Sequence, residues 1–432
     1  MHDLAKLDHR HLWHPFTQQR DWVATEPLII ERASGAHLVD VQGKQYIDGV
    51  SSLWTNIHGH RHPVLDQALR DQLDKVAHTT LLGLSHPTAI TLAERLSHET
   101  PGSMQRVFYS DNGSTATEVA LKMAFQYQQQ VGQTARTRFA SLAGAYHGDT
   151  LGAVSVGGIG LFHEIYRPLL FEGVVLPAPT SPGGDEEERC LEQALRALEA
   201  EASTIAALIV EPLVQGAAGM KMHTPEFLSA ILHRARQLGI LIVADEVAVG
   251  FGRTGSMFAM EQVDIVPDFL CLAKGIAAGY LPLAATLTTE TIYEAFLAKP
   301  EAYRQFFHGH TFTGNPLACA VALASLDLFE QENTLANAAA VSEVMRDALV
   351  GLAPEVAEIR QRGIMIGIDL LGEAEGSVPA VGEGHQVCMK ARSLGAILRP
   401  LGNTVVINPP LSIASEDART LIQIVTEAIR RR

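Results

Sequence analysis

Two stretches of sequence decide the fold of this 432-residue chain: Asp268-Phe-Leu-Cys-Leu-Ala-Lys-Gly275 and Gly239-Ile-Leu-Ile-Val-Ala-Asp-Glu246. Each is a short apolar run with a charged residue at its end, Lys274 in the first and Asp245 in the second. Continuous apolar runs of this length are typical of strands that are buried on both faces, as in a parallel sheet. Open α/β sheets bind ligands beyond the carboxyl ends of their strands, so we expect Lys274 and Asp245 to lie in a ligand site.

A lysine amine and an aspartate on neighbouring strands suit pyridoxal phosphate (PLP). The lysine would hold this cofactor as a Schiff base, and the aspartate would keep the pyridine nitrogen protonated so that the ring can accept electrons. Taken singly, a strand-terminal Asp is often a helix N-cap, and a Lys after an apolar run is usually a solvated end. The PLP hypothesis therefore depends on further motifs that agree with it.

The composition excludes several classes of protein. Hydrophobic residues make up 47% of the chain, which supports a sizeable core, and the length favours two domains. The formal net charge of −15 argues against a surface that binds nucleic acid or an anionic membrane. The four scattered cysteines are typical of reduced thiols, and we see neither a signal peptide nor an apolar run of membrane-spanning length. We therefore expect a cytoplasmic protein.

The middle of the chain alternates apolar runs with helical patterns, which predicts right-handed βαβ units and an α/β fold. The expected strands are 106–110, 206–211, 239–245 and 269–273, and the expected helices are 117–130, 187–201 and 225–237. Short strands at 363–371, 396–399 and 404–408, with a final helix from Ser415, indicate a different region near the C-terminus. We expect a large domain at 60–325, and a smaller one formed by 1–59 and 326–432.

The segment Ser110-Asp-Asn-Gly-Ser-Thr-Ala-Thr-Glu118 follows a predicted strand and opens a predicted helix. Thr115 and Glu118 have the spacing of a capping box, which would set the start of the helix. Gly113 allows close backbone approach and Ser114 offers a hydroxyl, so the free N–H groups and the helix dipole predict an anion site. An ordinary capped helix explains the same residues.

Three other positions suit ligand contacts. Tyr146 stands between small residues and can stack on a flat cofactor, although a core tyrosine has the same pattern. Arg399 follows a short apolar run, and its planar guanidinium suits either a carboxylate ligand or a structural salt bridge. The polar segment His308-Gly-His-Thr311 predicts a loop that can contact an anion.

Two patterns suggest other chemistry. His58-Gly-His-Arg-His62 looks like a metal cluster, but no Cys, Asp or Glu has ligand spacing to it, so we expect no metal. Gly250-Phe-Gly-Arg-Thr-Gly255 matches the G-x-G-x-x-G fingerprint of nucleotide sites. We reject that interpretation because Asp245-Glu-Val-Ala-Val249 separates the motif from the preceding apolar run, and no clear helix follows. A nicotinamide dehydrogenase is the alternative class of enzyme.

Together these motifs resemble the class III (fold type I) PLP-dependent aminotransferases, over nearly the whole chain. The most specific parts occur in the family's order and spacing: Ala244-Asp-Glu-Val247 with Gly250–Gly255, then Ala273-Lys-Gly275, then Thr313-Gly-Asn-Pro-Leu-Ala318. The resemblance implies a large domain with a mostly parallel central sheet, a smaller α+β domain from the two termini, and transamination with PLP.

The resemblance also implies roles for individual residues. Lys274 would carry PLP and move a proton, and Asp245 would pair with the pyridine nitrogen. Gly113 and Ser114 would bind the phosphate, and Tyr146 would pack near the ring and the substrate.

Within the family, His310 and Thr311 resemble the loop that reaches the phosphate of the neighbouring subunit. The resemblance therefore implies a homodimer with shared active sites. Substrate contacts are implied for Phe16, Leu53, Trp54, Tyr146, Gly309 and Arg399.

Three substitutions bear on substrate choice. Many relatives that act on ω-amino acids carry Glu where this chain has Ala217, and Phe16 and Leu53 replace a frequent Tyr and Trp of the pocket. Another class III enzyme that acts on an ω-amino acid or a diamine, and a non-enzymatic PLP-binding homologue, are the remaining alternatives.

Overall fold

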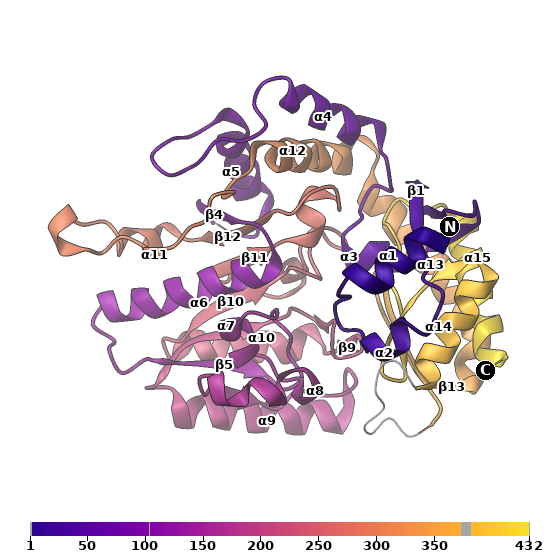
Figure 1. The fold of residues 1–432 in the computed structure, drawn as a ribbon. Helices are drawn as coiled ribbons and strands as arrows, with labels where there is room; N and C mark the ends of the chain where they lie inside the picture. The colour runs from indigo at the N-terminus through magenta and orange to yellow at the C-terminus, as the bar shows by residue number, and fades with distance from the viewer. Residues whose placement is uncertain (1, 103, 373–381, 432) are drawn as a thin grey trace.

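A seven-stranded sheet forms the centre of the larger part of the molecule in the computed structural model, which describes residues 2–102, 104–372 and 382–431 (Figure 1). Its strand order is β4-β12-β11-β10-β7-β5-β6. In that order the strands are Arg106–Ser110, Ala284–Thr288, Phe269–Leu272, Leu241–Asp245, Ile205–Val210, Arg138–Leu142 and Val174–Leu176. Apart from β12, neighbouring strands are parallel, which confirms the predicted α/β fold with a mostly parallel sheet.

Strand β12 runs antiparallel to both of its neighbours, β11 and β4. The chain reverses directly after β11 through a short 3-10 helix, η3 (Lys274–Ala277), and returns beside the strand that it has just left. The sequence analysis did not predict β5, β6 or β12. Lys274 therefore lies at a sharp reversal of the chain, beyond the carboxyl end of β11.

Helices cover both faces of the sheet (Figure 1). Alternate strand residues point to opposite faces, so Val243 and Phe269 pack with helix α6 (Gly113–Gln130), whereas Ala244 and Leu270 belong to the core with helix α10 (Pro225–Gln237). The other long helices of this part are α4 (Pro63–Leu73), α5 (Pro87–Glu99), α9 (Gly184–Glu201) and α12 (Pro316–Gln331). Within the described ranges, no helix is both long and apolar enough to cross a membrane.

Helix α6 begins four residues before the predicted start. Its N-cap is Asn112, whose side chain accepts from the backbone N–H of Thr115 at 3.1 Å, and Thr115 reciprocates at 3.2 Å. The predicted capping box of Thr115 with Glu118 is therefore wrong. Glu118 instead accepts hydrogen bonds from the Thr150 hydroxyl and the Gly152 N–H, because it faces the next loop rather than the helix start.

The two ends of the chain build the smaller part together, and Figure 1 shows the indigo and yellow elements side by side. Strands β1 (Ile30–Ser34), β2 (His37–Asp40) and β3 (Gln45–Asp48) form a sheet with β15 (Ala396–Ile397). A second sheet has the order β13-β14-β17-β16, with bounds Val356–Arg362, Met365–Leu370, Thr404–Ile407 and Arg399–Leu401. Helices α13 (Thr334–Leu349), α14 (Glu383–Leu394) and α15 (Ser415–Arg430) pack beside them.

Candidate active site

Lys274 and Asp245 lie beside each other at the carboxyl ends of two neighbouring parallel strands. Asp245 is in register with Cys271, and Lys274 follows three residues later, with φ of +43°. Burial lowers the pKa of the Lys274 amine, and the charge of Arg253 lowers it further, while Asp245 and Glu211 oppose this shift. The site thus places an amine with a depressed pKa close to a carboxylate.

Both residues line a cavity of about 520 Å³. Its wall also contains Trp54, the start of helix α6 at Gly113 and Ser114, and Tyr146. Such a volume is within the usual range for sites that bind small molecules and cofactors.

The Asp245 carboxylate has a fixed orientation. One oxygen accepts from His147 Nδ1 at 2.7 Å and the other from the Val247 N–H at 3.0 Å. His147 is buried, and its Nε2 has no hydrogen-bond partner among the described residues. His147 directly follows Tyr146 and lines the same cavity, but it was not among the site residues predicted from the sequence.

The first residues of α6, where the sequence predicts an anion site, line the cavity. Gly113 packs so closely on the Val247 side chain that a Cβ there would lie 2.6 Å from Val247 Cγ1. Ser114 Oγ accepts from the Asp149 N–H at 3.1 Å. Helix N-terminal N–H groups and the helix dipole attract anions, so this end of the cavity suits a phosphate.

Tyr146 lines another side of the cavity, and Arg399, which is not itself a lining residue, lies close enough for its charge to act on Tyr146. The Tyr146 hydroxyl donates to Asp149 at 2.7 Å. Burial and this hydrogen bond raise the pKa of Tyr146, whereas the positive charge of Arg399 acts to lower it. Arg399 is in strand β16, and burial lowers the pKa of its guanidinium. This side of the cavity suits a carboxylate ligand.

Glu211 is a buried carboxyl that the sequence analysis also missed. It accepts from the N–H groups of Tyr146 and Gly216, each at 3.0 Å, and burial raises its pKa to about 7. The strand-end argument that selected Asp245 applied equally to Glu211, because Glu211 directly follows β7.

Trp54 enters the cavity from a left-handed turn, Ser51–Trp54, labelled α3. Its four residues have φ values of +50°, +49°, +78° and +67°. Such a conformation costs roughly 1–2 kcal/mol per residue without glycine, so the surroundings must stabilise it. The Trp54 ring centroid lies 5.3 Å from the Lys274 Nζ.

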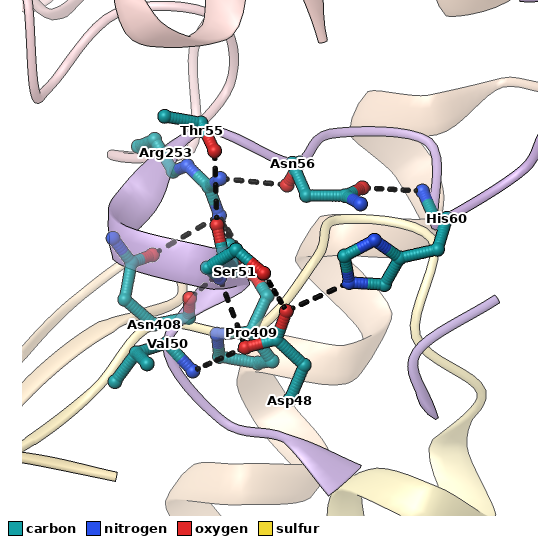
Figure 2. A network of polar contacts seen from close by, with 11 residues as sticks. Asp48, Val50, Ser51, Thr55, Asn56, His60, Arg253, Asn408 and Pro409 are labelled. Atoms are coloured by element: carbon teal, nitrogen blue, oxygen red, sulfur yellow. Dashed lines mark hydrogen bonds and ion pairs between the residues drawn. The ribbon is translucent and has the colours of Figure 1, made fainter. Parts of the chain in front are cut away.

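Arg253 contributes to that stabilisation, as Figure 2 shows. Its buried guanidinium donates to Ser51 Oγ at 3.1 Å, to the Asn56 carbonyl at 2.8 Å and to the Pro409 carbonyl at 2.7 Å. Burial lowers the pKa of Arg253 to about 9. In the sequence, Gly250–Gly255 served as a rejected nucleotide fingerprint and as a family motif, and neither use assigned a role to Arg253.

Six predicted site residues lie outside this cavity lining in the described single chain, and Arg399 is one of them. Phe16 and Leu53 are 57% and 45% exposed. Gly309 lines a second cavity of about 320 Å³, and His310 Nε2 lies 3.9 Å from Asp111 Oδ1. Thr311 is exposed. Phe16, Leu53, Gly309, His310 and Thr311 therefore do not join the cavity around Lys274 within one chain.

The histidines of the segment His58–His62 bind other groups. His58 contacts Ser325, His60 contacts Asp48, and His62 contacts Glu332. Burial lowers the pKa of His58 to about 4. Across the described ranges, no three side chains of His, Cys, Asp or Glu gather as metal ligands.

With this fold and site in place, comparison with known proteins defines the class. The family model for class-III aminotransferases matches residues 19–429, and the chain belongs to this family. The chain is 52% identical to the adenosylmethionine-8-amino-7-oxononanoate aminotransferase of Nitratidesulfovibrio vulgaris, over 99% of this chain and 81% of that protein. It is 44% identical to the Aquifex aeolicus protein of the same name, over 99% of this chain and 97% of that protein.

Solved structures agree with this assignment. The adenosylmethionine-8-amino-7-oxononanoate aminotransferase of Methanocaldococcus jannaschii superimposes with a TM-score of 0.95 at 39% identity, covering 100% of this chain and 99% of that one. A PLP-bound amine transaminase from an uncultivated Pseudomonas species superimposes with a TM-score of 0.90 at 36% identity, covering 98% of each chain.

Proposed function

We propose that this chain transfers an amino group to 8-amino-7-oxononanoate, giving 7,8-diaminononanoate in biotin biosynthesis, with PLP as its cofactor. The observation that carries the proposal is the Lys274 amine beside the Asp245 carboxylate in one cavity. The names of relatives that are 38–52% identical over nearly the whole chain support the choice of reaction. We also propose that it acts in the cytoplasm, since all four cysteines are free thiols.

The residues present fit PLP. Bound PLP supplies an electron sink for the carbon that gains or loses the amino group. Lys274 would attach it covalently and, once released, move a proton at that carbon, a task that its lowered pKa favours. Asp245, oriented by His147, would face the pyridine nitrogen. Gly113 and Ser114 would hold the phosphate at the start of α6.

For the substrates, we assign the acceptor's carboxylate to Arg399 and its apolar chain to Trp54, Tyr146 and Leu53. The proposed donor is S-adenosylmethionine, as in the names of the relatives. Lysine is the second candidate donor, because Phe16 and Leu53 remove a hydroxyl and a large aromatic ring from the expected adenosyl side.

A donor screen tests the proposal. Purified enzyme loaded with PLP is incubated with 8-amino-7-oxononanoate and with either S-adenosylmethionine, lysine or an ω-amino acid, and 7,8-diaminononanoate is measured by mass spectrometry. Product with S-adenosylmethionine supports the whole assignment. Product with lysine alone would change the donor but keep the acceptor. Absence of this product with all three donors would overturn the proposed function.

Substitution of Arg399 should act mainly on the acceptor. A hydrogen bond to a charged group contributes about 1.5–3 kcal/mol, so Arg399→Ala should raise the acceptor's KM by roughly 10- to 100-fold. The donor's KM should change far less. Arg399→Lys should recover only part of the loss, because an ammonium keeps the charge but not the planar fork. Equal increases in both KM values would contradict the role.

The proposed assembly is a homodimer in which Gly309, His310 and Thr311 complete the partner's site. Their position outside the cavity of their own chain supports it. Lys274→Ala subunits are mixed with Thr311→Ala subunits under conditions that allow exchange. If the loop crosses the interface, each mixed dimer has one intact site.

Random exchange of equal amounts should then restore about a quarter of wild-type activity. Mixed dimers make up half of all dimers, and each of them has one intact site out of two. Mixing each variant with itself is the control. Proven exchange without any recovered activity would argue against shared sites.

A further inference from the structure

The left-handed turn Ser51–Trp54 is held from one side by Asp48, a residue outside the cavity lining. Asp48 is completely buried. Its carboxylate accepts from the Ser52 N–H at 2.9 Å and from the Ser52 hydroxyl at 2.8 Å. It also accepts from His60 Nε2 at 2.8 Å (Figure 2). Asp48 therefore binds both the backbone and the side chain of a residue whose φ is +49°.

On the other side, the turn is joined to two distant parts of the chain. The Ser51 hydroxyl donates to the Asn408 carbonyl at 2.7 Å and accepts from Arg253 at 3.1 Å. The Arg253 guanidinium donates its hydrogen bonds to neutral acceptors. Burial lowers the pKa of Arg253, and the negative charge of Asp48 opposes this shift. Asp48 thus supports the turn directly and also through Arg253.

The end of this turn has little freedom of position. Trp54 is only 6% exposed and packs on Gly216 so closely that a Cβ there would lie 2.9 Å from its ring. Lys274 is another neighbour of the ring, with its Nζ 5.3 Å from the ring centroid. A shift of the turn would therefore move Trp54 relative to the amine that the proposed reaction uses.

We propose that Asp48 is a positioning residue of this active site, which keeps the left-handed turn in place and thereby sets Trp54 against Lys274. Asp48 does not line the cavity, so it acts through the turn. The kinetic part of this inference depends on the proposed function, whereas the position of Trp54 can be measured without any substrate.

The test replaces Asp48 with asparagine in the full-length, PLP-loaded protein. An amide offers one acceptor oxygen, so the bonds to Ser52 and His60 cannot all remain, and the charge opposite Arg253 is lost. In a Trp13→Phe, Trp22→Phe background, where Trp54 is the remaining tryptophan, acrylamide quenching should rise severalfold. The value of kcat/KM should fall on the order of 100-fold, the cost of displacing a positioned group by about 1 Å.

Asp40→Asn is the matched control. Asp40 is also a buried aspartate near the N-terminus, and it accepts from Tyr46, Gln42 and Lys44 without facing the cavity. Both variants should lower Tm. Only Asp48→Asn should change Trp54 quenching and kcat/KM, which separates positioning from a general loss of stability.

A rescue experiment makes the test specific. In Asp48→Ala, the further change Ser52→Gly should recover part of kcat/KM and of the shielding of Trp54, because glycine adopts positive φ without steric strain. If Asp48→Asn is insoluble, Ser52→Ala removes one bond to Asp48 and should raise quenching in the same direction. Quenching that stays at the wild-type value in the soluble variants would overturn the proposal. Wild-type protein that fails to aminate 8-amino-7-oxononanoate would instead refute the proposed function.

Discussion

Lys274→Ala should reduce kcat by at least about 10⁴-fold, because the variant loses both covalent attachment of the cofactor and a proton-transfer group. It should still bind PLP noncovalently, since Gly113 and Ser114 at the start of α6 are unchanged. The measurement is single-turnover kinetics together with the absorbance of bound cofactor.

Borohydride reduction of the wild-type protein, followed by peptide mapping, should locate the label at Lys274. Lys44→Ala is the control, because Lys44 is exposed and binds the Ser393 carbonyl far along the chain. That variant should keep its turnover. Label on a different lysine would refute the proposed mechanism.

Asp245→Asn is expected to have the second-largest effect. The loss of one partner of a buried charge pair, here the proposed pair of Asp245 with the pyridine nitrogen, costs about 3–5 kcal/mol, which corresponds to roughly 10²–10⁴-fold in rate. An amide cannot stabilise a positive charge on the pyridine nitrogen, so kcat should fall even though the new side chain keeps an acceptor for the Val247 N–H. Steady-state kinetics measures the loss of turnover, and thermal unfolding measures any loss of stability separately.

Asp268→Asn is the matched control for this variant. Asp268 precedes the neighbouring strand and accepts from the Ile242 N–H at 2.7 Å, but it does not line the cavity. Its substitution should lower Tm and leave kcat near the wild-type value. Turnover near wild type in Asp245→Asn itself would contradict the assigned role.

Much of the fold could be predicted because its strands are buried on both faces. The runs that end at Asp245 and Lys274 contain hardly any polar residues, so local composition alone indicated two central parallel strands. Strand β12 was not predicted. Its antiparallel direction results from the reversal of the chain after Lys274, and apolar composition does not encode that reversal. The start of α6 was misplaced because Thr115 has a capping partner on either side, and Asn112 is the one used.

The candidate site was only partly predictable, since its polar contacts join residues that are far apart in the chain. His147 and Asp245 are 98 positions apart and meet at 2.7 Å only once β5 and β10 belong to one sheet. Arg253 meets Ser51 across 202 positions, so no local pattern indicated its partners.

The sequence by itself determined the family, the mostly parallel sheet, and the two strand ends that carry Lys274 and Asp245, because burial and motif spacing are local properties of the chain. Only the tertiary structure decided that Ser51–Trp54 is left-handed and that Asp48 and Arg253 hold it. A left-handed turn without glycine is unfavourable locally. It persists because buried hydrogen bonds from distant segments stabilise it, and those bonds form only when the N-terminal, central and C-terminal parts of the chain come together.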